Sequence, residues 1–70
     1  MNKNQKVVFD VINYYVEEHE LNTMQAIYWS LTTSLNNPDS EFATAFKKLS
    51  QAEVNTVLSE CIKNKNTEKL

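Results

Sequence analysis

Polar side chains recur at intervals of four and three positions over the first twenty residues, at Lys6, Asp10, Asn13, Glu17 and Glu20. At about 100° per residue these positions share one narrow helical face, and apolar side chains fill the rest of the circumference. The segment is rich in β-branched residues, which favour strands, but its period predicts a helix over about residues 5–19. Such a wide apolar arc predicts that this helix is buried on more than one side.

A second helix is predicted from Thr23 to about Leu35, with Asn22 as its N-cap and Gln25 completing a capping box. Its large apolar side chains form a stripe that we interpret as the main packing face. The stripe consists of Met24, Ile27, Tyr28, Leu31 and Leu35. Trp29 does not belong to it and is expected on the other side of the helix.

Two further helices are predicted after a break at residues 36–40. Pro38 suits a first helical turn with Asn37 as its cap, so the third helix is expected to run to about Leu49. Ser50 and Glu53 have capping-box spacing ahead of an apolar run, which predicts a fourth helix over about residues 51–63. The sequence therefore predicts an all-α fold, a small bundle of four short helices, or three if the third and fourth act as one bent pair.

The 70 residues are expected to form a single helical domain, with frayed tails at about 1–4 and 64–70. A chain of this size buries only about 60% of the surface that it exposes when unfolded, so small folds often need a disulfide, a metal or a partner. Cys61 is the only cysteine and His19 the only histidine. This excludes an internal disulfide and argues against a structural zinc, which needs about four such ligands. The stability of the fold must therefore come from close helix packing or from association with another chain.

The sequence carries no pattern of a signal peptide and no run of about 20 apolar residues. A lone cysteine fits a reducing compartment. We therefore expect a soluble, cytoplasmic protein. The chain also has no glycine, which argues against phosphate-binding loops and nucleophile elbows.

His19 is the main candidate for chemistry, because Glu17, Glu18 and Glu20 surround it in the sequence. Together they could bind a divalent metal or act in general acid–base catalysis. On a helix, however, His19 falls on the apolar side and Glu17 and Glu20 on the polar side, so we favour a structural histidine near the helix end. Cys61 lies on an apolar stripe and is expected in the core. We predict no enzymatic activity, no catalytic residue, no metal, no cofactor and no small-molecule substrate.

The aromatic side chains of the first two helices give the sharpest functional hypothesis. Aromatic residues are prominent in protein interfaces, and one chain of this length cannot easily cover its second helix on both faces. We predict a small protein-interaction or regulatory module that forms a homodimer, with another protein as a further candidate partner. The expected contact residues are Tyr14, Tyr28 and Trp29.

A nucleic-acid-associated regulator is the alternative hypothesis. It would use Lys47, Lys48 and the Lys-rich C-terminal tail, with Lys63, Lys65 and Lys69, to contact phosphates. The net charge of −2 and the absence of arginine make this alternative weaker, because nucleic-acid binders usually present a clustered basic surface rich in Arg.

Overall fold

The computed structural model describes the backbone of residues 1–69 and the side chains of residues 1–63. It contains four helices: α1 (Lys3–Glu18), α2 (Thr23–Asn36), α3 (Glu41–Lys47) and α4 (Gln51–Lys69). No strand occurs in residues 1–69, so the predicted all-α bundle is confirmed. None of the described helices is both long and apolar enough to cross a membrane.

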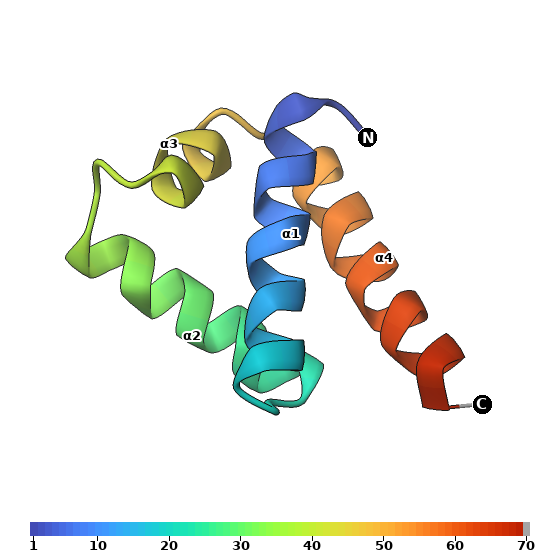
Figure 1. The fold of residues 1–70 in the computed structure, drawn as a ribbon. Helices are drawn as coiled ribbons and strands as arrows, with labels where there is room; N and C mark the ends of the chain where they lie inside the picture. Colours follow the sequence, from blue (N-terminus) through green and yellow to red (C-terminus); the bar gives the residue numbers. More distant parts are fainter. Residues whose placement is uncertain (70) are drawn as a thin grey trace.

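Helix α1 is the centre of the molecule, and α2, α3 and α4 all pack against it (Figure 1). Its buried side chains Val8, Ile12 and Val16 are four residues apart and form one continuous ridge. The other helices cover this ridge mainly with small and medium-sized residues, with one large side chain, that of Phe42. They contribute Ala26, Phe42, Ala45, Val57 and Cys61. The wide apolar arc of the first helix therefore has the expected consequence, burial on more than one side.

The bundle is thin. The Cα atoms extend over 36 × 23 × 15 Å. The shortest extent is close to one interhelical distance of about 8–10 Å plus the width of a helix backbone of about 4.6 Å. The helices are thus two deep in that direction, and each outer helix keeps one side toward solvent.

The starts of α2 and α4 agree closely with the capping residues predicted from the sequence. In α2, Asn22 Oδ1 accepts the Gln25 amide at 2.9 Å and Gln25 Oε1 accepts the Asn22 amide at 3.0 Å. In α4, the Ser50 amide donates to Glu53 Oε1 at 2.8 Å, and the Glu53 amide donates to Ser50 Oγ at 3.2 Å. Both predicted capping boxes are confirmed, because each satisfies backbone donors that a helix start leaves free.

The predicted start of the third helix is wrong. Ser40, not Asn37, is the N-cap of α3, and its Oγ accepts the Ala43 amide at 3.1 Å. Asn37 instead closes α2, because its backbone and side-chain N–H groups both donate to Thr33 O. The Ser40 amide then donates to Asn37 O at 3.0 Å, which makes Pro38 the second residue of a tight turn. Its fixed φ suits that position as well as a first helical turn, so the sequence signal was ambiguous.

The starts of α1 and α4 are joined by hydrogen bonds. Asn2 caps α1 and its Nδ2 donates to Glu53 Oε2 at 2.6 Å, while Gln5 Nε2 donates to Glu53 O at 3.1 Å. Gln5 is buried, and this bond satisfies its amide, which burial would otherwise penalise. The joint fixes the two helices side by side with their first turns together (Figure 1).

The connection between α1 and α2 turns sharply at Glu20. This residue has a φ of 54°, in the left-handed region that commonly ends helices and that glycine occupies most easily. The chain contains no glycine, so a glutamate accepts the strain. The turn places the start of α2 beside the end of α1.

The predicted fraying of the two chain ends stays a prediction. The side chains of residues 64–70 lie outside the described residues.

Candidate interaction surface

The buried side of α2 consists of small residues. Ala26 and Ser30 are its buried positions, and Ser30 Oγ donates to Ala26 O at 2.7 Å, which satisfies the hydroxyl inside the core. Small side chains four residues apart allow the backbone of α2 to approach α1 closely. The size of the side chains, more than their hydrophobicity, therefore determines which face of α2 packs against the core.

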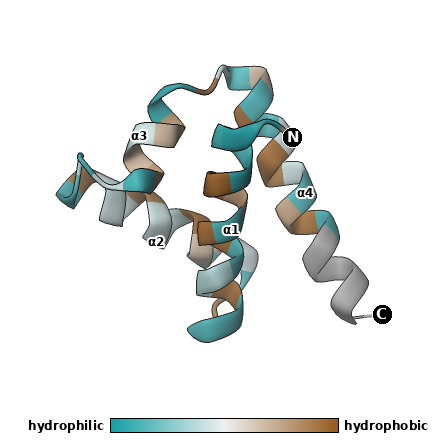
Figure 2. Cartoon of the chain, turned by 45° about the horizontal axis from the view of Figure 1, so that its top comes forward, coloured by the Kyte–Doolittle hydropathy of each residue, from teal (hydrophilic) through white to brown (hydrophobic). Residues whose placement is uncertain are grey.

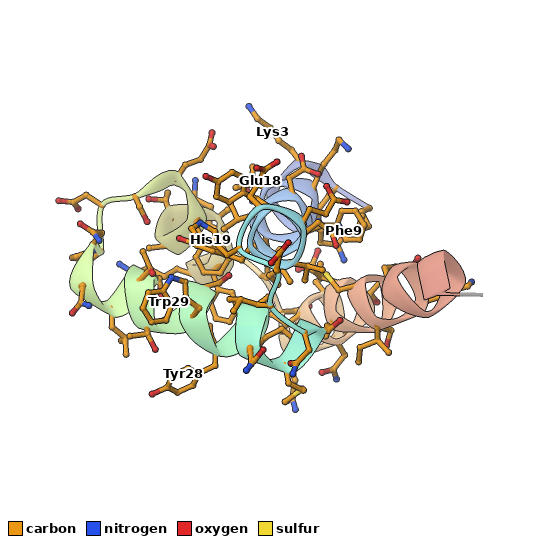
Figure 3. All side chains as sticks on the ribbon, turned by 60° about the horizontal axis from the view of Figure 1, so that its bottom comes forward. Lys3, Phe9, Glu18, His19, Tyr28 and Trp29 are labelled. Carbon is orange, nitrogen blue, oxygen red and sulfur yellow. The ribbon has the colours of Figure 1, made fainter. Side chains whose placement is uncertain are left out.

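The large apolar stripe of α2 does not face the core, which corrects the sequence interpretation. The exposed fractions are 69% for Met24, 70% for Tyr28 and 82% for Leu35, with Leu31 at 36%. Of the predicted stripe, Ile27 is partly buried against the core. Leu31 reaches the edge of the core, where it lines a small cavity of about 70 Å³ with Ile12 and Phe42. We call Met24, Tyr28, Leu31 and Leu35 the outer face of α2. Figure 3 shows Tyr28 projecting away from the body of the molecule on this side of the helix.

Trp29 lies beside the outer face and borders a groove. It is 50% exposed and leaves α2 on a different side from Tyr28 (Figure 3). With Tyr28, Met24, Leu21 and Gln25 it lines an open depression of about 380 Å³, which we call the N-terminal groove. Its lining is mainly apolar, which suits a hydrophobic side chain from a partner.

A second groove lies at the other end of α2, where it meets α3. We call it the C-terminal groove, and its volume is about 390 Å³. Leu31 and Leu35 line it from α2, Phe46 and Lys47 from α3, and Pro38 from the connection. The outer face therefore has a depression at each end.

The segment that carries these features has no charged residue. From Leu21 to Pro38 the sequence contains no Asp, Glu, Lys or Arg, although charged residues make up 23% of the chain. In Figure 2, α2 is drawn mostly in pale and brown tones, with little of the teal that marks hydrophilic residues. Solvent-exposed helical faces usually carry charges, so an uncharged, apolar exposed face is unusual.

The three aromatic residues chosen as contacts are all exposed, but they belong to two places. Tyr28 and Trp29 share the N-terminal groove. Tyr14 is 54% exposed and packs edge-on against Tyr15 and His19, with ring centroids 5.5 and 5.7 Å away. Tyr14 thus belongs to an aromatic cluster at the end of α1.

His19 has a structural position. It is the C-cap of α1, and its amide donates to Tyr15 O at 3.2 Å. Its ring lies 5.2 Å from that of Tyr15. Within the described residues, no group of three or more His, Cys, Asp or Glu side chains could hold a metal ion.

Cys61 is buried in the core, as the sequence indicates. Burial, with a smaller contribution from the negative charge of Glu60, raises the pKa of the thiol to about 11. A thiol with that pKa is protonated at neutral pH and is a poor nucleophile. Glu53 is the other perturbed group: hydrogen bonds from the Ser50 amide and hydroxyl, and from Asn2, lower the pKa of its carboxyl.

The basic residues of the alternative hypothesis are only partly within the described side chains. Lys47 and Lys48 are exposed in the last turn and at the C-cap of α3, where cations are favoured by the helix dipole. Lys63 is exposed on α4. Lys65 and Lys69 lie outside the residues whose side chains are described.

Comparison with protein-family models, with curated proteins and with solved structures finds no match to this chain.

Proposed function

We propose that the protein is a small, non-enzymatic interaction module that binds through the outer face of α2, with a second copy of the chain as its partner. The observation that carries this proposal is the exposure of large apolar side chains along a helix without charges. Contiguous apolar surface on a small protein marks an interaction site, because its burial against a partner is favourable.

The composition of the surface supports a binding role. Tyr and Trp often carry most of the binding energy in interfaces, and Tyr28 and Trp29 both line the N-terminal groove. Burying apolar area contributes about 25 cal/mol per Å². The outer face and the N-terminal groove offer this gain without requiring a charge to be desolvated.

The absence of charge favours a second copy as the occupant. In a two-fold dimer the same surface meets itself, so every charge near the axis would approach its own copy. The segment from Leu21 to Pro38 contains no such charge. A strongly charged partner would lose hydration on this face and find no opposite charge in return.

The size of the surface sets the expected strength. A helix of 14 residues is about 21 Å long, and a contact along one such helix falls short of the roughly 800 Å² per partner of a standard stable interface. We therefore expect reversible association that depends on protein concentration.

Light scattering over a concentration series tests the proposal. The wild-type molar mass is expected to rise from monomer toward dimer with concentration. Leu35→Glu should keep the chain monomeric over the same range, because it introduces a charge on the most exposed residue of the outer face. Ile62→Glu is the matched control, since it makes the same kind of change at an exposed apolar residue of α4, and it should associate like the wild type.

Two results would refute the proposal. One is a monomer mass at every concentration for the wild type. The other is association that Leu35→Glu leaves intact and Ile62→Glu abolishes, which would place the contact on α4. Circular dichroism of both variants shows whether each has kept its fold.

A further inference from the structure

We propose that the two copies pair α2 against α2 in antiparallel orientation, with the two-fold axis passing between positions 29 and 30. Met24 of one protomer then lies against Leu35 of its partner, and Tyr28 against Leu31. This arrangement rests on the proposed function and specifies how the same surface is occupied.

The spacing of the outer face has the required symmetry. Met24, Tyr28, Leu31 and Leu35 follow one another at intervals of four, three and four positions, so the pattern is the same in both directions along the helix. When two such helices are antiparallel, all four residues of each copy meet outer-face residues of the other. The same spacing keeps the four side chains on one side of a helix.

The shape of the surface distinguishes antiparallel from parallel pairing. Leu35 is the most exposed large apolar side chain at 82%, and the N-terminal groove lies at the opposite end of α2. Antiparallel pairing places each Leu35 at the N-terminal groove of the partner. Parallel pairing would instead set groove against groove and leave space unfilled, which costs contact energy.

The helix dipoles of the two α2 copies also favour the antiparallel arrangement. Antiparallel neighbours place the positive N-terminal end of each helix beside the negative C-terminal end of the other, whereas parallel neighbours place like ends together.

Cysteine cross-linking of the full-length chain tests the orientation. Chains carrying Met24→Cys are mixed with chains carrying Leu35→Cys at a concentration where the wild type associates, and are oxidised. The mixture should give a disulfide-linked dimer of one chain of each kind, identified by its mass, in severalfold higher yield than either variant alone. Positions 24 and 24 of two antiparallel copies are about eleven residues apart along the axis, or about 16 Å, beyond disulfide reach.

Two controls accompany the mixture. The wild-type chain reports any cross-link through Cys61, which is buried and should give none. Asn55→Cys, at an exposed position of α4, reports the yield from random collisions.

The outcomes separate the arrangement from the proposed function. If Met24→Cys cross-links with itself as efficiently as with Leu35→Cys, the pairing is parallel and the inference is wrong. If neither variant exceeds the Asn55→Cys control while scattering still shows dimers, the register is wrong and only the inference fails. A chain that stays monomeric in scattering refutes the proposed function as well.

Discussion

Glu53 performs three tasks at once. Its carboxylate accepts the Ser50 amide and the Asn2 side chain, and its carbonyl accepts Gln5. The hydrogen bonds to the charged form lower the pKa of the carboxyl below its ordinary value of 4.5. A single residue therefore caps α4 with its carboxylate and holds the start of α1 with both its carboxylate and its backbone carbonyl.

The lowered pKa of Glu53 predicts a pH dependence of stability. A carboxyl whose folded-state pKa lies below its unfolded value stabilises the fold above that value, and the contribution disappears as pH falls through the folded-state pKa. The wild type should therefore lose thermal stability as pH falls below 4.5. Glu53→Gln should be less stable at neutral pH and should lose less on acidification.

Thermal midpoints measured by circular dichroism from neutral to acidic pH check this expectation. Glu60→Gln is the control, because Glu60 is an exposed carboxylate of the same helix that is not part of the capping box. If the thermal midpoints of the wild type and Glu53→Gln fell in parallel with pH, the ionised carboxylate of Glu53 would not stabilise the fold, and the prediction would be wrong.

Capping residues were the most predictable part of the chain at this scale. Asn22 with Gln25 and Ser50 with Glu53 have side chains whose local hydrogen bonds depend on sequence spacing alone. Asn37 was misread because the same side chain can start or end a helix, and only the position of Thr33 O decided between them.

At the scale of the element, α2 reverses the usual relation between hydrophobicity and burial. Its small residues Ala26 and Ser30 face α1, and its largest apolar residues face solvent. The stripe could be predicted from the sequence, but its direction could not. The periodicity of a sequence gives the angles between side chains around one helix. It does not give the side of the helix on which the other helices pack. The uncharged run 21–38 was the available signal that α2 presents an apolar surface to solvent.

Because α2 lies close to α1, we expect the free energy of unfolding to depend strongly on side-chain size at the buried face of α2. Ser30→Leu should lower the free energy of unfolding by about 1–3 kcal/mol, because the added carbon atoms have no space between the two helices. Leu35→Ser, which removes a large apolar side chain from the outer face, should change the stability of the monomer by less than about 0.5 kcal/mol.

Urea unfolding at a concentration low enough to keep the chain monomeric provides the comparison. If Leu35→Ser proved the more damaging of the two substitutions, the orientation of α2 described above would be wrong.

At the scale of the whole molecule, one central helix and three covering helices produce a bundle only two helices deep. The number and type of helices followed from the sequence, because each has its own period and its own caps. Which surfaces remain exposed depends on how four short helices share one small core, and that is a property of the assembled fold. Trp29 lies outside the predicted packing stripe and is exposed, whereas Met24, Tyr28 and Leu35 belong to that stripe and are exposed as well. The role of Tyr28 and Trp29 as contact residues stays a prediction.

The central claim is that the outer face of α2 is covered when the protein associates. Its most direct test is a dilution series of the isotope-labelled wild-type chain followed by amide chemical shifts. We expect concentration-dependent shifts to concentrate on α2 and on the indole N–H of Trp29, the only tryptophan of the chain, with α4 nearly unchanged. Spectra that do not change with concentration, or changes centred on α4, would contradict the account.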